Sequence, residues 1–471
     1  MKPPAFRRLH PPSSPRNRER GITMLLVAVA LVTIIGMAAL SIDLVTLYLA
    51  KEEAQRSADS AALAAARVIS ISGITGAADP ATDTSFWQKI CGGSTSAATQ
   101  AAQAVAGQNA VGGSAGTVTV TYSAGGFGPA ADCSSGLPQA FAVNPLVTVK
   151  VQRSMPSFFS RIWGNTGSSI SATAVAEAFN PSASDLNNNG GTTGVVPVEP
   201  RCVKPWIVPN LDPGSSASFV STGNGAITTP GISSSTSTGV IGEIFTLFAD
   251  CGAATPCQTP DPLPRINVPT TGGNKYNGNS APAGNNLQYL PGEVPATSVA
   301  VPSCGNGTPY QAAVAGCDQN TVYECGILKG NVVDLSENPG SGLGDTATAL
   351  ACSLGSQTSV PIAGLDALDP SSYPYRITAG TANPYKIVAN TSITSSNSIV
   401  TLPIYDQTAV TIGAGNTQVT IVGFLQVFIN SVDANGTVNV TVLNVAGCGS
   451  STPNLPVTGS SPVPVRLVTP P

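Results

Sequence analysis

The strongest pattern in the chain is an uncharged apolar run, Ile22–Ile42, which Asp43 ends. A helix that crosses a membrane needs about 20 such residues. A cleaved signal peptide has a shorter apolar core of roughly 7–15 residues and a small-residue cleavage site. Because this run is longer and the helical pattern continues beyond it, we predict a retained transmembrane helix over residues 21–43.

The next stretch, Leu44–Ile71, contains no proline or glycine and is amphipathic. Its alanines recur at the spacing of one helix face: Ala54, Ala58, Ala61, Ala62 and Ala65. Small residues on a buried face let another backbone come close. One interpretation is an ordinary core helix, and the other is a helix also used in assembly. Periodicity does not separate the two, but both continue the apolar run as one long helix.

Further elements follow from local patterns. Glycines and a proline predict a loop over residues 72–94, and an alanine-rich segment predicts a helix over residues 96–110. Alternating valine, threonine and alanine predict three strands, at Thr117–Tyr122, Leu146–Gln152 and Ser169–Ala178. Between the last two lies SMPSFFSRIWG, which predicts a short helix or turn with an aromatic cluster. Residues 44–179 therefore predict an α+β domain.

The second half of the chain is less regular. Asn180–Val195 is rich in asparagine, glycine, serine and threonine, so residues 180–200 predict a linker. Residues 201–471 predict a β-rich domain, with its clearest strands late in the chain, at Ala409–Ile412, Thr417–Ile429 and Gly436–Val445. The last two predict a hairpin.

The ten cysteines fall in even numbers in the two predicted domains, two before position 180 and eight after it. Even numbers indicate disulfides formed in an oxidising compartment, although free buried cysteines are the alternative. Pairing Cys91 with Cys133 is the default in the first domain. In the second, Cys251 with Cys257 and Cys317 with Cys325 are the favoured local bridges, while eight cysteines allow 105 pairings.

The distribution of charge predicts the orientation of the chain in the membrane. Residues 1–20 hold six basic side chains against Glu19 alone, and five prolines. Such a tail stays in the cytoplasm by the positive-inside rule. The net charge is −4, and no basic face is present elsewhere, which argues against nucleic acid as a partner. No phosphate-binding glycine motif appears, which argues against a nucleotide.

Candidate chemistry is sparse. The single histidine is His10, and no CxxC pair exists, so we expect no metal, no cofactor and no histidine-based nucleophile. Asp250, Asp261 and Glu243 are close in sequence, but nothing aligns them as a catalytic pair. Four lysines could in principle activate a serine, without any supporting motif: Lys204, Lys275, Lys329 and Lys386. We therefore expect no enzymatic activity.

The N-terminal segment resembles a known family. An arginine-rich tail, a glycine, an apolar span closing on an aspartate and the string ADSAALAAA are similar to the Tad family, the TadG-like Flp pilus-assembly membrane proteins of bacteria. The residues that carry this resemblance are Gly21, Asp43, Tyr48, Gln55, Ala58, Asp59, Ala61, Ala62 and Leu63. The long helix is also similar to the first helix of type IV pilins. Pilin precursors are cut after a glycine followed by glutamate at the fifth mature position, where this chain has Leu26, so the resemblance implies an unprocessed anchor.

The resemblance implies a non-enzymatic component that assists assembly of a Flp/Tad-type pilus or secretion apparatus. Its partners would be the lipid bilayer and other Tad/Flp pilus components. The chain would cross the bacterial inner membrane once, with its pilin-like α+β domain and disulfide-containing β-rich domain in the periplasm or at the cell surface. The alternative is an adhesin that presents its C-terminal domain as a surface-binding module. For Asp43, either solvation at the membrane interface or a positive group on a partner is possible.

Overall fold

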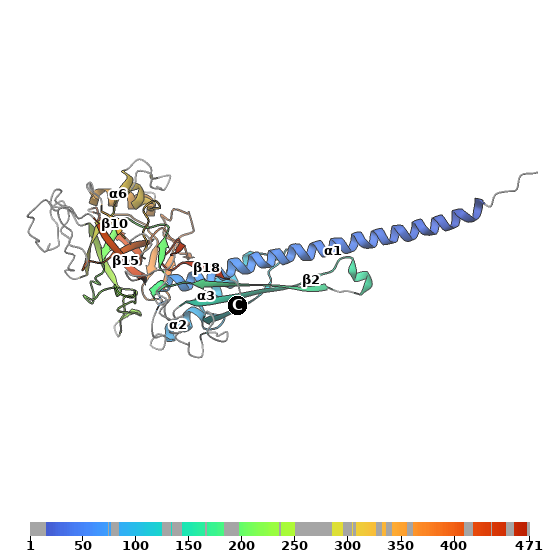
Figure 1. Ribbon diagram of the computed structural model, residues 1–471, viewed down its shortest axis with the longest axis horizontal. Helices are drawn as coiled ribbons and strands as arrows, with labels where there is room; N and C mark the ends of the chain where they lie inside the picture. Colours follow the sequence, from blue (N-terminus) through green and yellow to red (C-terminus); the bar gives the residue numbers. More distant parts are fainter. Residues whose placement is uncertain are drawn as a thin grey trace, which may run out of the picture.

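The computed structural model describes most of the chain as one elongated molecule (Figure 1). The described residues are 16–73, 75–76, 84–124, 133, 144–164, 167–182, 197–234, 237–249, 285–294, 304, 308–325, 332–335, 342–355, 361–408, 418–434, 436–448 and 456–468. The predicted strand at Ala409–Ile412 and the predicted bridge between Cys251 and Cys257 lie outside them.

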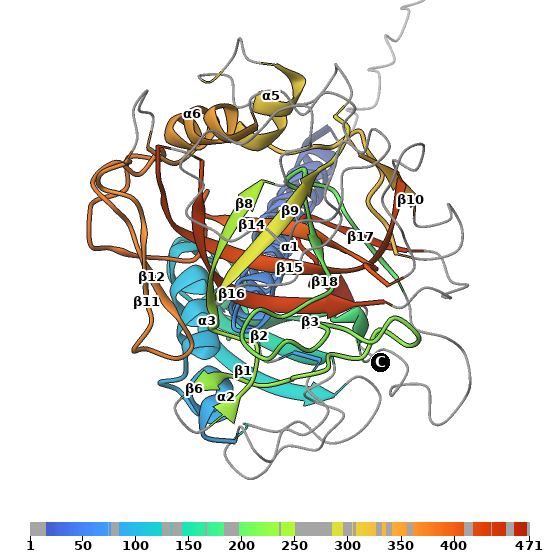
Figure 2. The ribbon, with the colours of Figure 1, turned by 90° about the vertical axis from the view of Figure 1, so that its left-hand side faces the viewer.

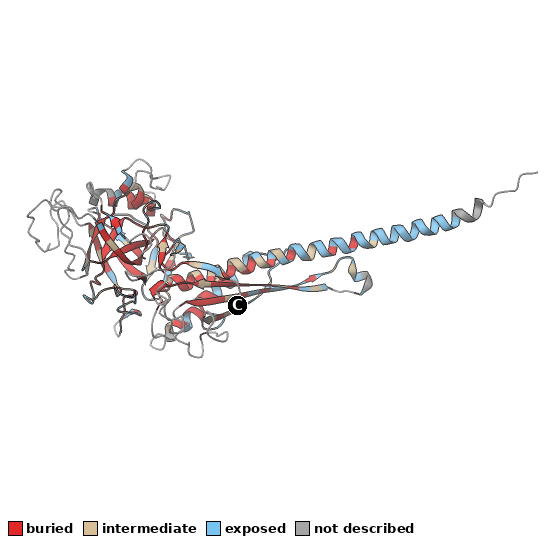
Figure 3. Ribbon diagram, viewed as in Figure 1, coloured by how far each residue is buried: buried red, intermediate tan, exposed pale blue. Residues whose placement is uncertain are grey.

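A single helix, α1 (Arg16–Ile71), runs through the predicted membrane span and into the folded body. Its 56 residues correspond to a rod of about 84 Å at 1.5 Å per residue. Figure 3 shows its N-terminal part exposed and its C-terminal part buried against the body. The prediction of one continuous helix is confirmed, because no proline interrupts the ladder of backbone hydrogen bonds.

The buried part of α1 packs on a four-stranded antiparallel sheet. In spatial order its strands are β1 (Thr117–Ala124), β2 (Pro145–Pro156), β3 (Gly167–Ala178) and β18 (Val465–Val468). The first three are the strands that the alternating pattern predicts. The fourth comes from the far end of the chain, pairing Val465 with Ala178, so the first sheet is completed by the predicted C-terminal domain.

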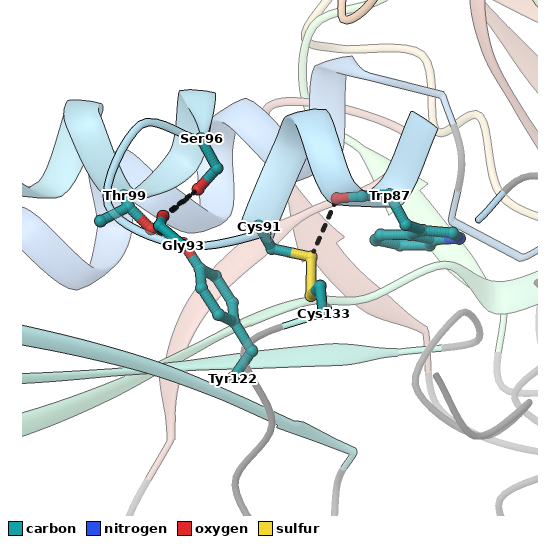
Figure 4. The surroundings of a disulfide bond; sticks show 7 residues. All are labelled: Trp87, Cys91, Gly93, Ser96, Thr99, Tyr122 and Cys133. Carbon is teal, nitrogen blue, oxygen red and sulfur yellow. Dashed lines mark hydrogen bonds between the residues drawn. A yellow bond between two sulfur atoms is a disulfide. The ribbon is translucent and has the colours of Figure 1, made fainter. Parts of the chain in front are cut away.

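Two shorter helices belong to this unit: α3 (Ala97–Gln108) packs against α1, and α2 (Thr84–Cys91) packs against α3. The loop predicted over residues 72–94 is wrong where α2 forms. The signal for this helix was the spacing of its large side chains: Trp87 and Ile90 are three positions apart, as on one helix face, and both are fully buried. Figure 4 shows the Cys91–Cys133 disulfide at the end of α2, near a chain of hydroxyls in which Tyr122 from β1 lies 2.7 Å from Thr99 of α3.

The rest of the chain forms a second body built on a closed ring of six strands (Figure 2). The ring order is β15 (Gln418–Val432), β14 (Ile399–Tyr405), β5 (Trp206–Pro209), β9 (Asn286–Pro291), β8 (Ile244–Ala249) and β16 (Val438–Gly447), which pairs again with β15. The predicted late hairpin is β15 with β16, and both strands are buried on both faces over most of their length.

The described residues also form further helices and several short strands. The helices are α5 (Pro309–Ala315) and α6 (Gly342–Gly355), and a 3-10 helix, η1 (Ser160–Trp163), belongs to the first unit. The short strands are β4 (Val198–Pro200), β6 (Ser233–Ser234), β7 (Ser237–Thr238), β10 (Val332–Asp334), β11 (Ala367–Asp369), β12 (Arg376–Thr378), β13 (Ser392–Ile393) and β17 (Val457–Gly459).

The disulfides of the second body are long-range. Cys202 pairs with Cys317, Cys304 with Cys352, and Cys325 with Cys448. The predicted local bridge between Cys317 and Cys325 is therefore wrong. Spatial neighbours, rather than sequence neighbours, set the pairs: the backbone of residue 203 exchanges hydrogen bonds with that of Asp318, which brings Cys202 beside Cys317.

The two bodies are joined by buried polar contacts at the end of α1. Ser70 donates to the carbonyl of Val463 at 2.7 Å, and the side-chain amide of Asn444, on β16, donates to the carbonyl of Ser70 at 2.7 Å. Just beyond the helix, Gly73 has a φ of 75°, and a Cβ there would lie 2.0 Å from the carbonyl oxygen of Leu443. Only glycine permits this close approach.

Asn180, which the sequence places at the start of a linker, is a fully buried part of this joint. Its backbone N–H donates to Asn144 Oδ1 at 2.7 Å. Its side-chain amide donates to the carbonyls of Thr75, at 2.9 Å, and of Val445, at 3.2 Å. Asn180 is the first residue of the predicted linker, and the composition of that segment does not show that this side chain has buried partners. Residues 183–196 lie outside the described part of the chain, so the linker itself stays a prediction.

We expect Asn180→Ala to lower the free energy of unfolding by about 1–3 kcal/mol, because it leaves buried carbonyls without donors. Chemical denaturation of the detergent-solubilised chain measures this. Asn224→Ala, in an exposed turn where the side chain accepts only from the N–H of Ala226, is the matched control and should change the value by less than about 0.5 kcal/mol. An equal loss of free energy of unfolding in both variants would contradict the role of Asn180 in joining the two bodies.

Candidate functional site

The N-terminal part of α1 is a bare apolar surface. Every residue of Gly21–Ile42 is exposed or half-buried except Ala39, and the segment is long and apolar enough to cross a membrane. An uncovered apolar surface of this extent is unfavourable in water. Its length and composition fit a lipid environment, so this segment is the part of the molecule that most clearly points to a function.

Asp43 lies where the bare part of α1 meets the folded body, and the residue is only 5% exposed. The backbone N–H of Phe158 donates to Oδ1 at 3.1 Å, and that of Ser160 to Oδ2 at 2.7 Å. The N–H of Phe159 reaches both oxygens, at 3.2 and 3.1 Å. One carboxylate thus binds three consecutive amides, an arrangement that stabilises the negative charge.

The donors form the tip of the hairpin that joins β2 to β3, at the start of η1, and we call residues 158–160 the hairpin tip. The hairpin reaches this level because β2 and β3 run alongside α1, with Pro156 paired to Gly167 (Figure 1). Neither sequence-based alternative for Asp43, solvation or a partner's positive group, describes these contacts. The aromatic cluster was a visible signal, but its partner lies 115 residues earlier in the chain.

C-terminal to Asp43 the same helix face is built of alanines, which contact β2 and β3. The fully or almost fully buried members are Ala50, Ala54, Ala58, Ala61, Ala62, Ala65 and Ala66. Their methyl groups keep the helix axis close to the sheet. A larger side chain here would separate the two layers.

The other family-motif residues fall into two groups. The side-chain amide of Gln55 donates to Asp59 at 2.7 Å and to the carbonyl of Thr173 on β3 at 3.3 Å, and Leu63 packs against the core. In contrast, Tyr48 is 65% exposed, and Gly21 has no neighbouring atom within 4 Å of its missing Cβ. The first group supports the fold, whereas the second is available to lipid or a partner.

The second body holds two unusual titratable groups. Burial, followed by a hydrogen bond and the charge of nearby Asp212, raises the pKa of Glu243 to about 8. Burial lowers the pKa of Lys204 to about 7, and its ammonium donates to the carbonyls of Val314 and Gly316. Within the described residues no group of three or more His, Cys, Asp or Glu could hold a metal ion. Lys275 and Lys329, as well as Asp250 and Asp261, lie outside those residues.

The architecture defines a class of protein in which two bodies, each with its own internal disulfides, follow one helix of membrane-spanning length. Residues 21–68 match the family described as "Putative Flp pilus-assembly TadE/G-like", and residues 75–176 match "Putative Tad-like Flp pilus-assembly". The resemblance found in the sequence is therefore confirmed by Tad-family matches across residues 21–176. No curated protein and no solved structure matches the chain, so its likeness to type IV pilins stays a prediction.

Replacing Asp43 by Asn should loosen the hairpin tip, because the amide side chain keeps the shape but loses the charge and one acceptor. Charge-assisted hydrogen bonds contribute about 1.5–3 kcal/mol, so we expect about 10–100-fold faster hydrogen exchange at the amides of residues 158–160. Glu53→Gln is the control, since Glu53 accepts from the N–H of Gly112 at 2.6 Å elsewhere on α1. Unchanged exchange at the tip would show that Asp43 does not hold it.

Glu243 should make stability depend on pH. Its folded-state pKa of about 8 lies above the ordinary 4.5, so its contribution is fully present below about pH 4.5 and is lost as the pH rises through about 8. Glu243→Gln keeps a neutral side chain at every pH. We expect its melting temperature to match the native chain at pH 4 and to exceed it at pH 9. The exposed Glu293→Gln is the control, and a constant offset for Glu243→Gln at all pH values would contradict this.

Proposed function

We propose that this protein is a non-enzymatic, single-pass component of the bacterial inner membrane that assists assembly of a Flp/Tad-type pilus or secretion apparatus. The observation that carries the proposal is the match of residues 21–68 to the TadE/G-like family. The structure makes this same segment one continuous helix, bare in its first half and part of a protein core in its second.

Two further observations support the orientation. The basic tail, residues 1–20, precedes the bare helix and favours the cytoplasm. The four described disulfides all follow the helix, and disulfides persist in oxidising compartments such as the periplasm. Both observations agree with an N-terminus in the cytoplasm and the two bodies outside it.

The mechanism we propose is mechanical positioning. Because α1 has no break between Arg16 and Ile71, the bodies cannot swing freely about the anchor. The joint around Ser70 and Asn180 and the addition of β18 to the first sheet attach the second body to the same rod. Partner components in the membrane would contact the bare helix, while those outside would contact bodies held at a set height above the bilayer.

Deleting the gene should abolish piliation, and the full chain should restore it. The double variant Ile34→Arg/Met37→Arg should fail to restore it, because each charge near the centre of a membrane helix costs about 2.5–3.5 kcal/mol. The double variant Ile34→Leu/Met37→Leu is the matched control. Electron microscopy counts the pili, and co-purification with other Tad components identifies partners.

Unchanged piliation in the deletion strain would overturn the proposal. Normal pili with lost surface adhesion would instead favour the adhesin alternative, in which the C-terminal body binds a surface.

A further inference from the structure

The uncharged surface of α1 does not end at Asp43, although the sequence suggests that it does. Leu44, Val45, Tyr48 and Leu49 are all exposed, while the Asp43 carboxylate is covered. The first exposed charged side chain after Gly21 is that of Lys51. The outward-facing uncharged surface thus extends over residues 22–49, about 42 Å at 1.5 Å per residue. This exceeds a hydrocarbon core of about 30 Å and approaches the full bilayer thickness of about 40–45 Å.

The burial of Asp43 removes the reason to place the membrane boundary there. Its charge needs no water because three amide N–H groups already bind it. Conversely, backbone N–H groups inside a membrane need internal partners, since lipid offers none. The carboxylate supplies those partners to the hairpin tip. The carboxylate thus accepts from the backbone N–H groups of the tip, and those N–H groups stabilise its charge.

The hairpin tip also presents side chains suited to a membrane interface. Phe158 is 61% exposed and Phe159 is 38% exposed, and the exposed Arg161 follows within η1. Phenylalanine is one of the apolar side chains that bury into the boundary between headgroups and acyl chains, and a nearby arginine is attracted to anionic lipid headgroups. Ala39, one helical turn closer to the N-terminus than Asp43, is buried, so the covered face of α1 extends one turn further into the span.

From these contacts we propose that the hairpin tip inserts into the outer interface of the bilayer that α1 crosses, with Asp43 as the clamp that makes insertion possible. The inference rests on the proposed membrane anchor. The partner of the hairpin tip is lipid, because the bilayer that covers Leu44, Val45 and Leu49 surrounds α1 at the level where the tip contacts this helix. The first sheet then sits directly on the membrane, attached by the helix and by the hairpin.

Spin labels on the full chain in liposomes of phosphatidylethanolamine and phosphatidylglycerol test this. Among the described residues no cysteine is free, and Phe158→Cys adds one labelling position to them. Because Cys251 and Cys257 lie outside those residues, the chain without an added cysteine is labelled in parallel and its signal is subtracted. Val388→Cys is the control in the second body, at a side chain that is 77% exposed. Leu31→Cys reports on the span itself. The measured quantity is relaxation of the label by oxygen, which concentrates in lipid, relative to a water-soluble nickel chelate.

We expect the oxygen-to-nickel ratio at positions 31 and 158 to exceed that at position 388 by about tenfold, since both would contact lipid. Asp43→Asn, added to Phe158→Cys, should lower the ratio at position 158 several-fold, with unchanged label mobility at position 388 reporting an intact body. A ratio at position 158 equal to that at 388 overturns the insertion but leaves the anchor if position 31 stays lipid-exposed. A water-exposed label at position 31 overturns the anchor itself.

Discussion

The alanine face of α1 lies close against β2 and β3 because most of the buried side chains between Ala50 and Ala66 are single methyl groups. This close packing lets one uninterrupted helix be a bare apolar rod in its first part and the central element of a protein core in its second. The sheet is consequently held at one height along the rod, and the hairpin between β2 and β3 ends beside Asp43. The contacts at the hairpin tip and at the joint between the bodies depend on that spacing.

Two buried polar side chains then connect parts of the chain that are far apart in sequence. Asp43 binds amides more than 100 residues later, and Asn180 connects the segment after α1 with β16. Both side chains make directional hydrogen bonds to backbone groups of other segments. Apolar packing alone tolerates small shifts, whereas these contacts select one alignment of the helix, the hairpin and the second body. The resulting rigidity suits a protein proposed to position other components.

Local patterns predicted local structure well. The continuous helix and the alternating strands β1, β2 and β3 depend on interactions between residues near in sequence, which periodicity reports. The helix α2 was missed because glycines and a proline around it predict a loop, although the spacing of Trp87 and Ile90 carried the signal. The pairing of Cys317 with Cys202 could not be predicted, since it depends on which strands become neighbours.

The sequence by itself determined the apolar helix, its alanine face and the Tad-family relationship of residues 21–176, because each is encoded in contiguous residues. Only the tertiary structure decided what Asp43 does, since its partners are backbone amides that carry no sequence signature. Likewise, only the fold showed that β18 completes the first sheet and that Asn180, the first residue of the predicted linker, is fully buried. The same holds for the uncharged exposed surface of α1, which continues past Asp43 because the fold covers that charge.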